Sequence, residues 1–244
     1  MPPYSEISEV AAGYPVHIGR DNQLWLQCWR DQCTDFHQSI VNPLLVRFWP
    51  SLELTYGSRV FVPLCGKSLD MIWLAQQGHD VIGVELSPVA VENFFRENDL
   101  RPTKQRMGQF TLWRDGKLSI LCGDYFALTI DHIGPLDTVY DRAALTALPE
   151  NIRSCYVGQL TKLVPKTAGI FLLTIEDAAT DATMSQAFAV DEEIAALYSV
   201  GFEIDLAHVD SRFEADLESP SQPPMRVEYK VYRLSARAAV QLGG

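Results

Sequence analysis

The chain has 244 residues, of which 47% are hydrophobic and 21% charged, a balance typical of one globular α/β domain. A formal net charge of −11 repels phosphate backbones and anionic lipid, which argues against nucleic acid or a membrane surface as a partner. The densest basic group, formed by Arg101, Lys104 and Arg106, is interpreted as a solvated loop. No heptad pattern indicates self-assembly, so we expect a monomer.

Targeting and cysteine signals indicate a cytoplasmic protein. No apolar run approaches the ~18 residues that span a bilayer, and the N-terminus lacks the basic flank and apolar stretch of a signal peptide. The five cysteines are odd in number and contain no CxxC pair, which suggests neither a disulfide framework nor a metal site. Reduced thiols in a cytoplasm fit this pattern.

The N-terminal part of the chain predicts an extension followed by helices. Residues 1–20 mix Pro, Gly and polar residues without periodicity, so we expect a poorly ordered extension before a single domain over 21–244. Residues 22–34 form a predicted helix with Trp25 and Trp29 on one face. A second short helix is expected over Pro43–Trp49, with Pro43 in its first turn.

A strand–helix–strand–helix pattern follows and sets the fold class. A short apolar strand, Arg59–Pro63, leads through the turn LCGKS to a helix that Ser68 would cap and that ends at Gly78. A second strand is expected over residues 80–85, and Ser87 caps the next helix, with Pro88 at its first position. This alternation predicts parallel strands joined by right-handed crossovers.

The remaining chain predicts five more strands and two helices. Strands are expected over 118–122, 136–140, 169–175, 202–209 and 226–234, and helices over 150–164 and 191–199. Because the last two strands follow one another, separated by a Pro- and Ser-rich loop, they indicate an antiparallel hairpin at one edge. The sequence thus predicts a doubly wound, mostly parallel α/β sheet of seven strands.

In such a sheet, ligands bind beyond the carboxyl ends of the strands. The first turn, PLCGKS, is not a P-loop, because position 61 is Phe where that motif needs Gly. Its single glycine also argues against a dinucleotide, whose pyrophosphate needs a glycine-rich turn. One glycine still permits a turn close to a smaller nucleoside without phosphates.

Polar residues at the ends of later strands complete a nucleoside site. Glu85 ends the second strand, where its carboxylate can accept both ribose hydroxyls. Asp124 and Tyr125 follow the third strand and could hold an adenine. Arg142 follows the fourth strand and could meet the cofactor or an anionic group of the substrate, with Asp141 orienting it.

Four segments of the chain resemble the thiopurine S-methyltransferase family. The run RVFVPLCGKSLDMIWLAQQGHDVIGVELS, residues 59–87, is similar throughout to that family's first strand–helix–strand. So are the element WxxxW ending in FHQ, the segment YDRAALTALP at 140–149 and the terminal KVYRL at 230–234. The similarity covers roughly residues 22–235.

The resemblance implies a class I S-adenosylmethionine-dependent methyltransferase with a helical lid at its N-terminus. It implies that Phe36 lines the thiol pocket together with Arg142. It places these residues at S-adenosylmethionine: Trp25, Trp29, Leu64, Gly66, Glu85, Asp124, Tyr125 and Arg142. The expected products are S-adenosylhomocysteine and a methylated small thiol, such as a thiopurine or an aromatic thiol.

The acceptor is the least determined part of this interpretation. The chain has Asp35 where the family usually has Gly, and the loop 211–225, which helps to cover the substrate in relatives, matches no motif. Two other classes of acceptor remain alternatives. One is selenium or tellurium compounds, which would imply a role in metalloid resistance instead of thiol detoxification, and the other is a different small nucleophile such as halide. A non-catalytic binding module with the same fold is a third interpretation.

The expected chemistry is an in-line displacement by sulfur, which needs alignment more than a base. We therefore assign no catalytic base, and His37 and Asp141 are both interpreted as structural. The indoles of Trp25 and Trp29 are expected to pack as core and to face the sulfonium cation.

Overall fold

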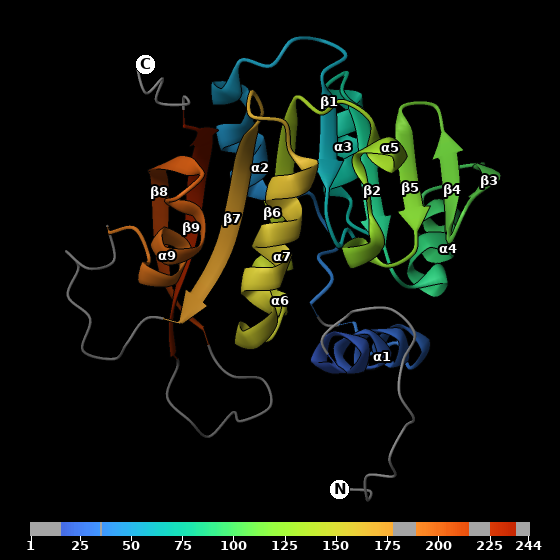
Figure 1. Ribbon diagram of the computed structural model, residues 1–244, viewed down its shortest axis with the longest axis horizontal. Helices are drawn as coiled ribbons and strands as arrows, with labels where there is room; N and C mark the ends of the chain where they lie inside the picture. Colours follow the sequence, from blue (N-terminus) through green and yellow to red (C-terminus); the bar gives the residue numbers. More distant parts are fainter. Residues whose placement is uncertain (1–15, 35, 178–188, 215–224, 238–244) are drawn as a thin grey trace, which may run out of the picture.

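The computed structural model describes residues 16–34, 36–177, 189–214 and 225–237. Within them, one nine-stranded sheet has the order β3-β4-β5-β2-β1-β6-β7-β9-β8 (Figure 1). Its strands are β1 (Arg59–Val62), β2 (Asp80–Glu85), β3 (Thr103–Met107), β4 (Phe110–Asp115), β5 (Leu118–Cys122), β6 (Thr138–Arg142), β7 (Gly169–Asp177), β8 (Phe202–Glu214) and β9 (Met225–Ala236).

The described helices connect these strands. The α-helices are α1 (Val16–Arg30), α2 (Pro43–Phe48), α3 (Asp70–Gln76), α4 (Pro88–Glu97), α5 (Ile130–Ile133), α6 (Ala144–Ala147), α7 (Glu150–Leu163) and α9 (Glu192–Tyr198). Two short 3-10 helices are η1 (Trp49–Leu52) and η2 (Tyr125–Ala127).

The central strands confirm the doubly wound fold. Strands β5, β2, β1, β6 and β7 are mutually parallel. The chain winds outward from β1 through β2 to β5 and then returns to place β6 on the other side of β1. The switch point of the winding therefore lies between β1 and β6, where an open α/β sheet binds its ligand. The expected antiparallel hairpin is also present as β8 and β9.

The predicted strand count of seven was wrong, because a second hairpin, β3–β4, extends the other edge. Gly108, at φ +58°, starts its two-residue turn between Met107 and Phe110. The residues interpreted as a solvated loop, Lys104 and Arg106, lie on the outermost strand of this hairpin. Basic side chains on such an edge oppose pairing with another chain.

Two apolar layers pack on opposite faces of the sheet. Alternate residues of the parallel strands point to opposite faces, so β1 contributes Phe61 to one core and Val60 and Val62 to the other. Helices α6, α7 and α9 supply the first core, and α2, α3 and α4 supply the second. Figure 1 shows α1 outside both layers, across the carboxyl ends of the strands.

Most helix boundaries agree with the sequence, and two do not. Ser87 caps α4 by accepting a hydrogen bond from the Ala90 N–H, with Pro88 in the first turn. Helix α1 begins at Val16, so the expected boundary at residue 20 lies inside it, and it ends at Arg30 rather than at 34. Ser68 accepts from the Asp70 N–H but lies one residue before the N-cap of α3.

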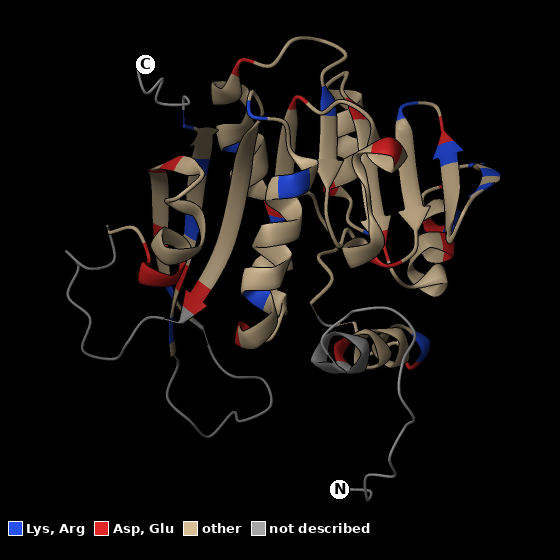
Figure 2. Ribbon diagram, in the orientation of Figure 1, with Lys and Arg blue, Asp and Glu red and all other residues tan. Residues whose placement is uncertain are grey.

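The charged residues are spread over many elements (Figure 2). Figure 2 shows Lys and Arg on several separate elements, including the edge strand β3 and its neighbour β4. In the part of the chain that the structure describes, no helix is both long and apolar enough to cross a bilayer.

Candidate active site

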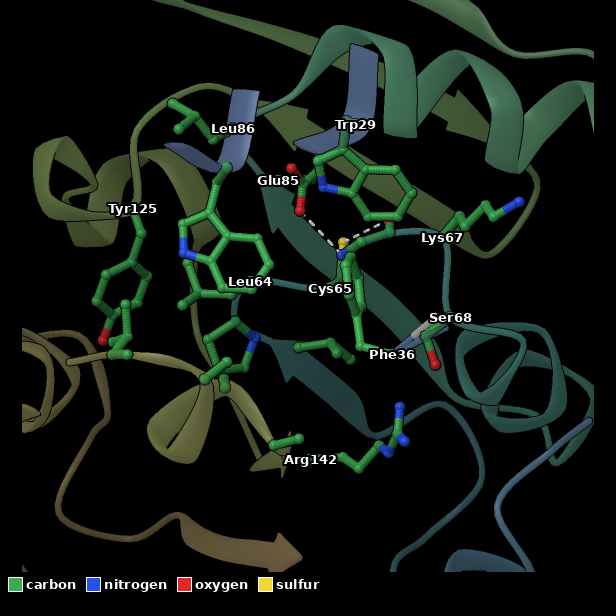
Figure 3. Close-up of a pocket in the computed structure, with 18 of the residues that line it drawn as sticks. Trp29, Phe36, Leu64, Cys65, Lys67, Ser68, Glu85, Leu86, Tyr125 and Arg142 are labelled. Carbon is green, nitrogen blue, oxygen red and sulfur yellow. Dashed lines mark hydrogen bonds between the residues drawn. The ribbon is translucent and has the colours of Figure 1, made fainter. Parts of the chain in front are cut away.

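A large cavity lies where the carboxyl ends of the parallel strands face α1. It is lined by residues of α1, of the turns that follow β1, β2 and β6, and of the segment after β5. Its wall contains every residue that the sequence assigned to the site: Trp25, Trp29, Phe36, Leu64, Gly66, Glu85, Asp124, Tyr125 and Arg142. Figure 3 shows most of these side chains around one space.

The turn after β1 brings backbone close to this space. Leu64 and Gly66 both have positive φ, +45° and +53°, and the Cys65 N–H donates to the Val84 carbonyl 2.9 Å away. A Cβ on Gly66 would lie 3.2 Å from Cζ2 of Trp29. The glycine is therefore needed both for the backbone conformation and for contact with the aromatic residue above it.

A second strained residue lies in the same wall. Ala143, directly after β6, has φ +59° and precedes α6. A left-handed conformation costs a non-glycine residue roughly 1–2 kcal/mol. Leu64 and Ala143 thus place two such residues in one cavity, which is common at functional sites.

Glu85 is almost fully buried at the end of β2. One carboxylate oxygen accepts from the Gly66 N–H at 2.9 Å, and the other accepts from the Ser87 N–H at 2.7 Å (dashed lines in Figure 3 show bonds among the drawn residues). Burial raises its pKa to about 7, against the lowering effect of these backbone donors. Each oxygen keeps a further lone pair, so the carboxylate can accept two more donors from the cavity.

Asp124 makes two hydrogen bonds that hold the segment after β5 in place. Its Oδ1 accepts from the Phe126 N–H at 2.9 Å, which caps η2, and its Oδ2 accepts from the Asn22 amide at 3.0 Å. Tyr125 lines the cavity with its ring, while its hydroxyl donates to the Tyr156 carbonyl in the core. Asp124 therefore connects the part of the cavity wall beside Tyr125 to α1.

Helix α1 and the segment after it form an aromatic roof. The ring of Phe36 contacts Trp25 and Trp29 edge-on, with centroids 5.4 and 5.5 Å apart. Trp29 is buried, whereas Phe36 is 45% exposed at the mouth. This arrangement confirms that the two Trp residues share one face of the helix.

Arg142 lies in another part of the cavity wall, where β6 ends. In the view of Figure 3, it lies apart from Glu85 and Tyr125, beyond Phe36. The expected role of Asp141 in orienting it was wrong, because neighbouring residues of a strand point to opposite faces. Asp141 is fully buried and accepts from the Tyr156 hydroxyl at 2.6 Å, and burial raises its pKa to about 6.

His37 also lies in the cavity wall. Burial lowers its pKa, and the positive charges of Lys67 and Arg142 lower it further, against the raising effect of Glu97. The wall also contains residues that sequence reasoning missed, among them Asp21 and Asn22 of α1, Leu86 after β2, Phe126 after Tyr125, and Ala143 and Ala144 after β6. Their position close in the chain to predicted site residues was the only signal that could have found them.

Some sequence expectations fall outside the described residues. They concern Asp35, most of the loop 211–225 and the first fifteen residues of the extension. In that loop, residues 211–214 continue β8 and Met225 begins β9.

The sequence that builds this site matches a known family. The family model described as thiopurine S-methyltransferase matches residues 20–237. The chain belongs to this family. A thiopurine S-methyltransferase of Stutzerimonas stutzeri is 65% identical over 217 residues, 89% of this chain and 92% of the relative. One of Methylococcus capsulatus is 40% identical over 90% of this chain and 99% of its own.

Solved structures agree with the methyltransferase fold. The 1,6-didemethyltoxoflavin-N1-methyltransferase of Burkholderia thailandensis has a TM-score of 0.55 at 14% identity, covering 93% of both chains. Magnesium protoporphyrin IX methyltransferase of Synechocystis has a TM-score of 0.54 at 16% identity, covering 91% of this chain and 99% of that one. At these identities the likeness concerns the fold alone.

The cavity fits S-adenosylmethionine, the methyl donor of the thiopurine S-methyltransferase family. Glu85 presents free lone pairs where ribose hydroxyls can donate, and Leu86, Tyr125 and Phe126 offer an apolar wall for a base. The indoles of Trp25 and Trp29 line the same wall, and electron-rich rings of this kind favour a cation. The protein is therefore an S-adenosylmethionine-dependent methyltransferase.

Proposed function

We propose that this enzyme methylates the sulfur of a small thiol, such as a thiopurine or another aromatic thiol. The observation that carries the proposal is Arg142, whose guanidinium shares a cavity with Glu85 and makes no ion pair with any residue described here. Because arginine keeps its charge, it favours an acceptor that is negative, as a thiolate is. Phe36, in the same wall, offers an aromatic edge for a flat ring, which favours an aromatic thiolate over inorganic anions such as selenite, tellurite and iodide.

The chain's own residues act mainly by alignment. When bound, S-adenosylmethionine supplies a methyl group on a positively charged sulfur. Glu85 and the wall around Tyr125 fix one end of the cavity, while Phe36 and Arg142 hold the acceptor at the other. Holding two reactants in line can lower a barrier by about 7–11 kcal/mol. The roof of Trp25 and Trp29 excludes water from the space between the methyl donor and the acceptor.

A transfer assay with a radiolabelled methyl group tests the proposal. The acceptors are a thiopurine, an aromatic thiol, selenite, tellurite and iodide. We expect transfer to both thiols, and we expect Arg142→Gln to raise the KM for the thiolate at least tenfold, whereas Arg96→Gln, on the outer face of α4, leaves it unchanged. Transfer to selenite, tellurite or iodide but to neither thiol would contradict the proposal.

A cytoplasmic location and a small-molecule acceptor as the principal partner are part of the same proposal. All five cysteines lie in the described part of the chain, and none forms a disulfide, which supports a reducing compartment. Cell fractionation tests the location, and recovery of the protein with a membrane or secreted fraction would contradict it.

A further inference from the structure

One histidine differs from the others in its surroundings. His79 accepts a hydrogen bond from the Trp49 indole, His132 bonds to Thr129, and His208 packs against Phe48. His37 alone, among the histidines whose side chains the structure describes, lines the cavity. Its ring makes no hydrogen bond to any described residue, so both ring nitrogens are available to a ligand.

The backbone holds His37 at the acceptor end. Its N–H donates to the Thr34 carbonyl at 2.8 Å, which closes a turn between α1 and α2. His37 follows Phe36 in this turn. The charges that act on its ring are those of Lys67, Glu97 and Arg142. The Lys67 ammonium is paired with Glu97 at 2.7 Å. Among the described residues, Arg142 is therefore the unpaired cation next to His37.

We propose that His37 accepts the proton of the acceptor thiol during methyl transfer. The inference rests on the proposed function, since a base is useful only where the acceptor arrives as a protonated thiol. Its ring is neutral at pH 7, because burial and the two nearby cations disfavour the imidazolium. A neutral imidazole beside an arginine suits a thiol well, since the base takes the proton and the guanidinium stabilises the thiolate.

The step balances within the cavity. The thiol S–H bond breaks and its proton bonds to an imidazole nitrogen of His37. The thiol sulfur uses the freed electron pair to bond the methyl carbon, while the donor's carbon–sulfur bond breaks and leaves its electron pair on the donor sulfur. The imidazolium next to Arg142 then releases its proton to water, because His37 is only partly buried.

Two acceptors of different acidity test the inference. An alkyl thiol with a pKa of ~8.5 is only about 3% thiolate at pH 7, whereas a nitro-substituted aromatic thiol is already ionised. For His37→Gln we expect kcat/KM for the alkyl thiol to fall about 30-fold at pH 7. The loss should shrink to less than threefold at pH 9.5, where the alkyl thiol ionises unaided. The rate with the aromatic thiol should change less than twofold.

Matched measurements separate this role from a structural one. His132→Gln makes the same substitution outside the cavity and should change neither rate. Calorimetry should show unchanged S-adenosylhomocysteine binding for His37→Gln, which establishes that the cavity is intact. Equal losses for the two thiols, or no loss for the alkyl thiol, would overturn the role of His37. Failure of the wild-type enzyme to methylate either thiol would instead overturn the proposed function and the inference with it.

Discussion

Gly66 is the single residue on which the first turn depends most directly. Its φ is +53°, and a methyl group added to its Cα would lie 3.2 Å from Trp29, so the indole would have to shift by a few tenths of an ångström. We expect Gly66→Ala to lower the free energy of unfolding by about 1–2 kcal/mol, since it adds left-handed strain. It should also weaken S-adenosylhomocysteine binding at least tenfold, because Trp29 must move. Denaturation and calorimetry measure the two effects.

Gly108→Ala is the control for backbone strain. Its φ is +58°, but nothing lies within 4 Å of the added methyl group. The same loss of stability is expected, with cofactor binding unchanged. If both variants bound S-adenosylhomocysteine equally well, contact between Gly66 and Trp29 would not shape the site.

Glu85 makes cofactor binding depend on pH. Its pKa is about 7 in the free protein, and ribose hydroxyls donate best to the ionised carboxylate. From pH 8 to pH 6 the ionised fraction falls about tenfold, so affinity for S-adenosylhomocysteine should fall by a similar factor. Calorimetry at these pH values measures it, and a flat profile would contradict the assignment.

The same shift has an opposite effect on the stability of the free protein. Folding raises the pKa of Glu85 above its ordinary value of 4.5. The contribution of Glu85 to the free energy of unfolding is therefore fully present below pH 4.5 and is lost as pH rises through about 7. Because the cofactor is expected to bind more tightly when Glu85 is ionised, bound cofactor should stabilise the fold more at pH 8 than at pH 6.

Residues at strand ends were predictable because the carboxyl edge of a parallel sheet gathers them. Glu85 and Arg142 are the last residues of β2 and β6, Asp124 follows β5 closely, and all three line the cavity. The interpretation of Asp141 failed for a reason that was also present in the sequence, since adjacent strand residues face opposite sides. The availability of the His37 ring could not be predicted, because it depends on contacts from distant elements.

Among the elements, α1 supplies one wall of the cavity through Asp21, Asn22, Trp25 and Trp29. Its main polar tie to the sheet, among the residues described, is the 3.0 Å bond from Asn22 to Asp124. We expect Asn22→Ala to reduce S-adenosylhomocysteine affinity about fivefold while lowering stability by no more than about 1.5 kcal/mol, since one hydrogen bond is lost. Calorimetry and thermal unfolding measure the two quantities.

Gln27→Ala is the control on the same helix. Gln27 is exposed and bonds only to neighbours in the chain, Arg30 and Asp31. This variant should bind the cofactor product as the wild type does. If Asn22→Ala also bound it with unchanged affinity, the bond to Asp124 would not hold α1 in place.

The β3–β4 hairpin shows where element prediction reached its limit. Strand β3 reads TKQRM and is almost entirely exposed, so it has no apolar alternation to reveal it. Only β4, with Phe110 and Trp113 buried, carries a partial signal. The five parallel strands, by contrast, are apolar runs buried on both faces and were all predicted.

Over the whole molecule, a buried charged cluster joins β7 to β9. The Lys230 ammonium lies 2.7 Å from Glu176 and 3.3 Å from Glu228, and both Lys230 and Glu228 are 4% exposed. Lys230→Met should cost about 3–5 kcal/mol of unfolding free energy, because it leaves the Glu176 carboxylate without its cation, whereas Glu228 keeps its pair with Arg226. Chemical denaturation at pH 7 measures this.

Lys162→Met is the control, since Lys162 is exposed on α7, and it should change stability by less than about 0.5 kcal/mol. A loss below about 1 kcal/mol for Lys230→Met would mean that the cluster adds little to the fold. The cluster was not predictable, because its pairs depend on the register between β7 and β9.

The most direct test of the account is the affinity of Glu85→Ala for S-adenosylhomocysteine. Calorimetry measures this affinity, and a thermal unfolding curve first establishes that the variant is folded. Glu92→Ala, which removes an exposed acid of α4 outside the cavity wall, is the matched control. Loss of two hydrogen bonds to a carboxylate should weaken binding of the Glu85 variant about 100-fold and leave the control unchanged. Affinity within twofold of the wild type for folded Glu85→Ala would contradict the placement of the cofactor in this cavity.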